Sequence, residues 1–244
     1  MRNIKLLIEY DGTNFCGWQR QNNGRTIQEE IEKALEKVLK RPVKIHGSGR
    51  TDTGVHALGQ VASFKANITV PMDKIPLALN SLLPEDISVK GASEVEEDFH
   101  ARYSAKGKKY IYQIYNGPLR SPLLRNYAYF VAHPLDLNRM QEAAQYFLGS
   151  HDFKGFMASG SCVQDTVRTL YKLDVYFHEN LIKIEVEGNG FLYNMVRIIS
   201  GTLVEVGKEK ILPTEMQKII ASGIRESAGP TAPAQGLYLA EVFY

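Results

Sequence analysis

The chain has 244 residues, of which 44% are hydrophobic and 23% are charged. This is ordinary globular composition, which excludes a collagen-like, a disordered or a disulfide-dense chain. The 29 basic and 27 acidic residues leave a net charge of only +2, so composition does not favour a passive coat protein for nucleic acid. The two cysteines, Cys16 and Cys162, lie far apart in the sequence, which favours reduced thiols in the cytoplasm over a secreted framework. No stretch approaches the roughly 18 apolar residues of a membrane-spanning helix, so we expect no membrane association.

Residues 1–104 alternate between strand-like and helix-like patterns. Strands are expected at 4–10, 43–46, 60–64 and 87–95, and helices at 27–39 and 75–83. Thr26 and Glu29 have the spacing of a capping box, which predicts that the Thr26 side chain caps the first helix. The resulting order is βαββαβ.

Residues 105–244 repeat this order. Strands are expected at 109–115, 170–177, 181–187 and 236–244, and helices at 138–148, at 191–206 and after Pro213. Each half then has the ferredoxin-like split βαβ order, which predicts an α+β protein with helices on one face of each antiparallel sheet. We therefore expect two domains, 1–104 and 105–244, with the active-site cleft between them.

The densest group of chemically active residues is the segment 46–64, HGSGRTDTGVHALGQVASF. Gly49 and Gly54 have the spacing of a phosphate-binding loop, but the Lys and the Ser or Thr that should follow are absent, and Asp52 breaks the dinucleotide-binding pattern. A metal site from His46, Asp52 and His56 has no cysteine or second carboxylate to complete it.

Two interpretations of Asp52 remain open from the spacing alone. Asp52 can form an Asx turn in a glycine-rich connection. Alternatively, Arg50 and Asp52 project to the same side of an extended backbone, where the guanidinium keeps the carboxylate ionised. An ionised carboxylate suits a nucleophile and does not suit a general acid, and no second carboxylate is present for ordinary glycoside hydrolysis.

Three further features each allow a structural and a functional interpretation. Arg197 interrupts an apolar helix and needs an anionic partner, which a salt bridge or a substrate can supply. The lysines before Tyr110 and Tyr112 can contact phosphates beside stacked bases, or can protect the start of a strand whose tyrosines point into the core. The aromatic segment 10–19 can bind a ligand or close a hairpin.

Taken together, these segments resemble the tRNA pseudouridine synthase A family over the whole chain. The residues that carry the resemblance are Tyr10-Asp-Gly-Thr, Phe15, Gly17-Trp-Gln19, Gly49-Arg-Thr-Asp-Thr-Gly-Val-His56, Gly59-Gln-Val61, Phe64, Phe99-His-Ala-Arg-Tyr-Ser104, Lys109-Tyr110, Met195-Val-Arg197, Gly201 and Gly236-Leu-Tyr-Leu239.

The resemblance implies an enzyme that isomerises uridine to pseudouridine at positions 38, 39 and 40 of the tRNA anticodon arm, without metal or cofactor. It implies that Asp52 is the catalytic aspartate, that Tyr110 packs on the target uracil and that Arg197 pairs with Asp52. It also implies that Arg50 helps to displace the target nucleotide. An extruded uridine needs an aromatic wall, which Tyr110 and Phe191 can supply.

The family also implies the partners of this chain. We expect a homodimer in which one tRNA touches both subunits. Four basic residues close to the motifs, Lys108, Lys109, Arg20 and Arg25, are our candidates for contacts with the tRNA backbone.

Two alternatives from other functional classes remain. A non-catalytic RNA-binding protein would present two ferredoxin-like sheets to RNA, but it has no use for a carboxylate facing phosphates. A nucleoside glycosidase would use Asp52 and release free uracil.

Overall fold

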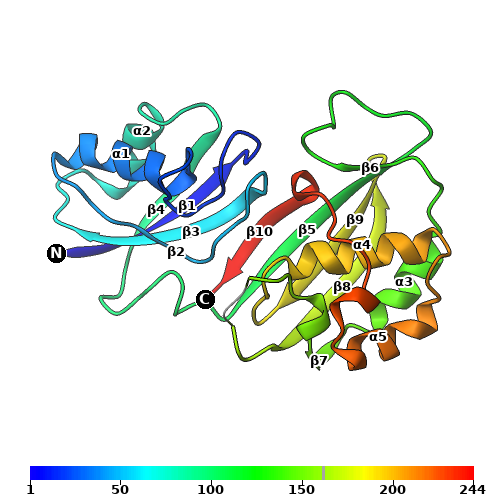
Figure 1. Cartoon of the computed structure of the whole chain (residues 1–244). Coiled ribbons are helices and arrows are strands. Elements are labelled where there is room, and N and C mark those ends of the chain that lie inside the picture. The colour runs from blue at the N-terminus through cyan, green and yellow to red at the C-terminus, as the bar shows by residue number, and fades with distance from the viewer. Residues whose placement is uncertain (161–162) are drawn as a thin grey trace. The chain divides into compact units, whose positions relative to one another are not determined.

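The computed structural model describes residues 1–160 and 163–244, so Cys162 lies outside the described residues. The described part divides into two compact units (Figure 1). Unit 1 comprises residues 1–106 and 238–244, and unit 2 comprises residues 107–237. Cys16, in unit 1, is a half-buried free thiol.

The sheet of unit 1 has the strand order of a ferredoxin-like fold. Its elements are β1 (Arg2–Tyr10), α1 (Ile27–Leu39), β2 (His46–Gly47), β3 (His56–Ala66), α2 (Ile75–Asn80), β4 (Ile87–Val95) and β10 (Leu237–Phe243). β1 lies between β4 and β3 and is antiparallel to both. The far edge of β3 is shared, because β2 pairs antiparallel with its later part and β10 pairs in parallel with its first residues. The start of β10 therefore lies beside the start of β3.

The buried side chains of unit 1 lie on one face of its sheet and on one face of its helices, and together they form one core layer. Ile4, Leu6 and Ile8 of β1 are fully buried, and α1 buries Ile27, Ile31 and Leu35 at helical spacing. α1 and α2 lie on the same side of the sheet (Figure 1). Burial of such side chains contributes about 2 kcal/mol each.

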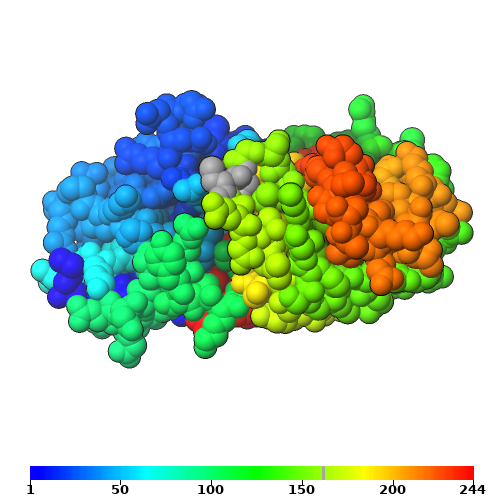
Figure 2. Space-filling view, turned by 60° about the horizontal axis from the view of Figure 1, so that its bottom comes forward, coloured from blue at the N-terminus to red at the C-terminus, as the bar shows by residue number. Residues whose placement is uncertain are grey.

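Unit 2 consists of mostly antiparallel strands with a layer of helices. Its elements are β5 (Gly107–Asn116), β6 (Tyr129–Val131), α3 (Leu137–Gln145), β7 (Gly149–Asp152), β8 (Val167–His178), β9 (Leu181–Gly188), α4 (Met195–Gly207) and α5 (Met216–Ser222). The strands follow the order β5-β9-β8-β7, and β6 pairs in parallel with β5. α4 is buried over most of its length, whereas the segment that carries α5 lies at the surface (Figure 2).

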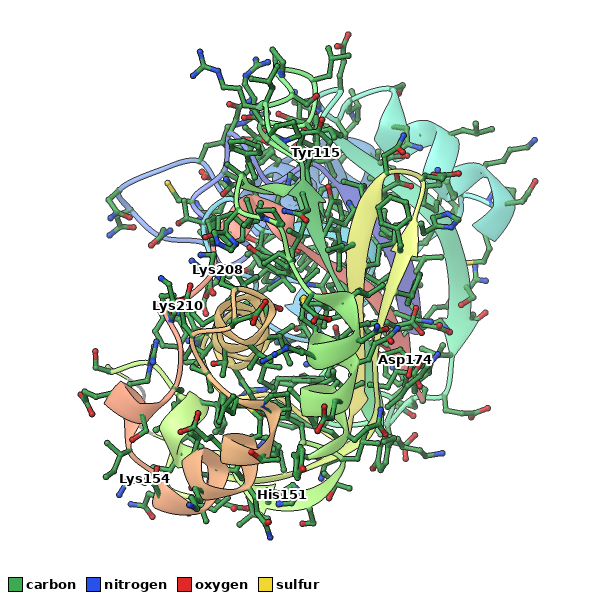
Figure 3. The ribbon with its side chains drawn as sticks, turned by 90° about the vertical axis from the view of Figure 1, so that its right-hand side faces the viewer. Tyr115, His151, Lys154, Asp174, Lys208 and Lys210 are labelled. Atoms are coloured by element: carbon green, nitrogen blue, oxygen red, sulfur yellow. The ribbon has the colours of Figure 1, made fainter. Side chains whose placement is uncertain are left out.

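The two faces of the unit 2 sheet differ in chemistry. Tyr110, Tyr112 and Ile114 of β5 are buried on the face that α3 and α4 cover, which agrees with the interpretation that the tyrosines of this strand point into the core. The opposite face carries charged side chains, and Asp174 of β8 lies on the side away from α4 (Figure 3).

The α+β fold and the βαββαβ order of unit 1 are confirmed, and the differences are local. α1 begins at Ile27 as expected, but the capping box is wrong, because the buried Thr26 hydroxyl has no hydrogen-bond partner in the described part of the chain. The helix expected from residue 191 begins at Met195, since Asn194 has a left-handed backbone with φ of 59°. The short strands β6 and β7 were not predicted.

Within residues 1–160 and 163–244, none of the helices has both the length and the apolar character needed to cross a membrane.

Candidate active site

The loop that carries Asp52 runs from β2 to β3 in unit 1 and is held at its start by Gln60. The Gln60 side chain is fully buried. Ser48 Oγ donates to Gln60 Oε1 at 2.6 Å, and Gln60 Nε2 donates to the carbonyl of Gly49 at 3.1 Å. A buried amide with both ends bonded fixes the backbone at Gly49 in one position.

A tight turn follows Asp52. The N–H of Val55 donates to the Asp52 carbonyl at 3.1 Å, and Gly54, the third residue of this turn, has φ of +77°. A turn with positive φ at its third residue favours glycine there. Thr51 is buried, Asp52 is half-buried and Arg50 is exposed, so the side chains alternate as in extended backbone before the turn starts.

The segment that follows β1 packs against the Asp52 loop and supports it. The hydroxyl of Tyr10 lies 2.8 Å from Thr51 Oγ1, and the N–H of Trp18 donates to the Thr51 carbonyl at 3.1 Å. A Cβ on Gly17 would press on that same carbonyl, and a Cβ on Gly12 would overlap the carbonyl of Val55. The aromatic segment 10–19 therefore serves as the support of the loop, and its glycines permit the close approach.

His56 ends the loop as a buried core histidine. Its Nδ1 accepts a hydrogen bond from the N–H of Gly12 at 3.1 Å and lies 3.1 Å from Asp11 Oδ1, and its ring stacks on Tyr238 with centroids 4.8 Å apart. The described residues contain no group of three or more His, Cys, Asp or Glu side chains that could hold a metal ion.

In unit 2, the structure brings together two of the aromatic candidates. Tyr110 is nearly buried, and its ring meets Phe191 edge-to-face with centroids 5.0 Å apart and planes at 81°. This arrangement is the favoured one for aromatic pairs and holds both rings in position.

Arg197 is half-buried at the start of α4, and its guanidinium is held by oxygen atoms. Nε donates to the carbonyl of Ala232 at 2.7 Å, and Nη1 donates to Asn194 Oδ1 at 2.9 Å. The Arg197 carbonyl also accepts from the N–H of Ala232 at 3.1 Å. Burial raises the pKa of Tyr112, and the charge of Arg197 opposes that rise.

Arg25, Arg20 and Lys109, which are candidates for RNA contacts, have partners within their own units. Arg25 lies 4.4 Å above the Phe15 ring and 3.1 Å from Asp86. Arg20 is exposed and 3.5 Å from Glu32. Lys109 lies 2.9 Å from Glu185, and Lys108 beside it is half-buried.

Sequence reasoning missed Glu185 altogether. This carboxylate lies on the face of the sheet opposite α3 and α4, and it is only 7% exposed. Its partners are Lys172 at 2.7 Å, Lys109 at 2.9 Å and the hydroxyl of Tyr176 at 3.4 Å. Burial alone would raise its pKa, but the hydrogen bonds from Lys172 and Lys109 outweigh burial and lower it. The only available signal was a charged residue inside an apolar strand.

Comparison with known proteins identifies the relatives of this chain. A family model described as tRNA pseudouridine synthase matches residues 6–104 and 143–244. Proteins named tRNA pseudouridine synthase A are 54% identical in Acetivibrio thermocellus and 56% identical in Ruminiclostridium cellulolyticum, each over all of both chains. Among solved structures, the archaeal box H/ACA sRNP Nop10-Cbf5 complex aligns at 11% identity over 92% of this chain and 60% of that chain. Its TM-score of 0.37 is too low to support a structural argument.

Proposed function

The chain belongs to the tRNA pseudouridine synthase family and isomerises uridine to pseudouridine in tRNA, and we propose that Asp52 is the catalytic residue of this reaction. The observation that carries the proposal is the placement of this one carboxylate. Asp52 is half-buried. Thr51 before it is held by Tyr10 and Trp18, and the turn after it has a positive φ at Gly54. Such support holds a reacting group in one geometry, which is what positioned catalysis needs.

The reaction breaks the bond between N1 of uracil and C1′ of the ribose, turns the base and joins C5 to C1′. The hydrogen on C5 leaves as a proton and N1 takes up a proton, so the product is an isomer of the substrate. An aspartate can attack C1′, add to C6 or remove a ribose proton, and each of these steps requires its ionised form. The detached uracil must be kept from leaving, so the site has to exclude water.

We assign four substrate-binding roles by the same proposal. Tyr110 packs on the uracil, and Phe191 supports it through the edge-to-face contact. Arg197 presents a guanidinium whose plane is fixed by Ala232 and Asn194. Arg50, exposed beside the Asp52 turn, helps to displace the target nucleotide from its stack.

The test is tritium release from tRNA carrying 5-tritiated uridine, with wild type and Asp52→Asn in parallel. Wild type is expected to release tritium, and Asp52→Asn is expected to bind the tRNA with unchanged affinity but to release none, because the amide keeps the shape and loses the nucleophile. Comparable release by the variant would refute the role of Asp52. Free uracil as product would favour a glycosidase, and binding without release by wild type would favour a non-catalytic RNA-binding protein.

The finer features belong to the same proposal. The modified positions are 38, 39 and 40 of the anticodon arm, the protein is a homodimer in the cytoplasm, and Lys108, Lys109, Arg20 and Arg25 face the tRNA backbone. Mapping of pseudouridine along the product tRNA and the sedimentation mass of the free protein test the first two statements.

A further inference from the structure

The positive charge of the chain is concentrated in two acid-free stretches. Residues 37–51 hold five basic and no acidic side chains, and residues 99–135 hold six basic and no acidic ones. The remaining 192 residues hold 18 basic and 27 acidic side chains, so the whole positive excess lies in these two stretches. Because RNA affinity depends on neutralised phosphates, their location matters more than the net charge of +2.

The two stretches meet on the surface of unit 1. The ring of His46, on β2, lies 4.9 Å from the ring of His100. The turn that carries His100 is anchored to the same place, because the N–H of Ala101 donates to Oγ of Ser63, and Ser63 is the β3 residue that pairs with His46. Lys44 and His46 are both exposed on either side of the buried Ile45.

Four basic residues of the two acid-free stretches differ from three lysines elsewhere in unit 1, because no carboxylate of the described residues neutralises them. Lys40, Arg41, Lys44 and Arg102 make no ion pair within the described residues, and Nη2 of Arg41 is buried without a hydrogen-bond partner there. The three lysines Lys33, Lys65 and Lys90 have carboxylate partners at 3.1, 3.9 and 3.1 Å. Lysine in the last turn of α1 can offset the helix dipole, but Lys40, Arg41 and Lys44 follow the end of the helix.

An aromatic ring is exposed at the same place. Tyr103 is 77% exposed, its ring lies 4.4 Å from that of His100, and the guanidinium of Arg102 is 5.7 Å from its centre. Four acidic residues precede this turn, Glu94, Glu96, Glu97 and Asp98, of which Glu94 and Glu97 are paired with Arg2 and Lys65. An exposed ring beside a guanidinium is suited to stack an unpaired base while the cation meets phosphate.

We propose that Lys44, His46, His100, Arg102 and Tyr103, named here the His100 surface, bind the ribose-phosphate backbone of the tRNA outside the nucleotide that is isomerised and stack one unpaired base. This inference rests on the proposed function and names a second contact of unit 1 with the same substrate. The His100 surface adds affinity and has no part in bond breaking.

The first test measures the affinity for unmodified tRNA as a function of NaCl concentration. Lys44→Gln with Arg102→Gln removes two phosphate contacts, so the plot of log affinity against log salt should become shallower by about 1.4 to 1.8. The matched control is Lys65→Gln with Lys90→Gln, which removes two exposed lysines of the same unit that have carboxylate partners. Its slope should equal that of wild type.

The second test separates stacking from charge. Tyr103→Ala should weaken tRNA binding about fivefold or more, and Tyr103→Phe should retain wild-type affinity, because stacking needs only the ring. For Lys44→Gln with Arg102→Gln and for Tyr103→Ala, KM should rise while kcat with saturating tRNA stays unchanged. A wild-type salt slope in the charge variant, together with unchanged affinity in Tyr103→Ala, would overturn the proposal. Absence of tritium release by wild type would instead refute the proposed function and leave the binding data interpretable.

Discussion

Gly54 is the residue on which the Asp52 turn most directly depends. Its φ of +77° lies where a residue with Cβ is strained, so Gly54→Ala should lower the free energy of unfolding by about 1 kcal/mol. Because the strained backbone at position 54 lies two residues from Asp52, tritium release should fall as well. Urea unfolding and turnover measure the two effects.

Gly223 provides the control for that substitution. It has φ of +62°, lies in unit 2 at the end of α5, and an added Cβ would meet nothing within 4 Å. Gly223→Ala should therefore cost a similar free energy of unfolding and leave turnover unchanged. Equal turnover in the two variants would contradict the argument that the turn geometry positions Asp52.

Two substitutions of Tyr110 distinguish the role of its ring from the role of its hydroxyl. Tyr110→Phe keeps the edge-to-face contact with Phe191, whereas Tyr110→Ala removes the ring and leaves a cavity that costs about 3 to 5 kcal/mol. If stacking on the uracil is its main role, kcat should fall much less in Tyr110→Phe than in Tyr110→Ala. Thermal unfolding distinguishes a folded but inactive Tyr110→Ala from an unfolded one, and equal losses in both folded variants would assign the role to the hydroxyl.

The sequence motif identifies Asp52, Tyr110 and Arg197 as candidates, but it does not show what holds a side chain in place. Arg25 was chosen as an RNA contact because it lies close to a motif, and its guanidinium in fact lies over Phe15 and beside Asp86. Which way a long side chain points depends on tertiary neighbours that a local pattern does not contain. Its RNA contact stays a prediction.

At the scale of elements, the sheet network around Glu185 links β5, β8 and β9. Glu185→Gln leaves Lys109 and Lys172 without their shared carboxylate, so the free energy of unfolding at neutral pH should fall by about 1 to 3 kcal/mol. Because the pKa of Glu185 is lowered in the folded protein, its contribution is present above its unfolded value near 4.5 and is lost as pH falls through the folded value. Urea unfolding of both proteins at pH 7 and below pH 4 should show the difference narrowing in acid.

The same network provides a test of Lys109. If its main role is structural, Lys109→Gln should destabilise unit 2 but leave the salt dependence of tRNA affinity unchanged. A slope that becomes shallower by about 0.7 to 0.9 would instead support the proposed contact with the tRNA backbone.

Long periodic elements were predictable and short or irregular ones were not. β1 and α1 have clear periodicities that their burial follows. β6 and β7 have three and four residues, too few for a period to emerge, and their pairing depends on β5 and β8. Thr26 shows a different failure, because its hydroxyl is buried at the start of α1, where the pattern predicted a cap.

At the scale of the whole molecule, the last strand of the chain completes the first unit. Tyr238 of β10 stacks on His56 at the end of the Asp52 loop, while Tyr244 donates its hydroxyl to the carbonyl of Ala101. Unit 1 therefore depends on residues that follow all of unit 2 in the sequence. Pairing between residues so distant in the sequence raises the contact order, which slows folding.

A pair of truncations tests this dependence. Removal of residues 238–244 takes away the stacking partner of His56 and the strand beside the start of β3, so amide protection around residues 55–57 should fall and tritium release should be lost. Removal of Tyr244 alone leaves the His56 contact intact and loosens the turn that carries His100, Arg102 and Tyr103, so kcat should persist while KM for tRNA rises. Hydrogen exchange and turnover of both variants measure the two effects. Full activity after the longer truncation would mean that the Asp52 loop holds its geometry without β10, through Tyr10, Trp18 and Gln60 alone.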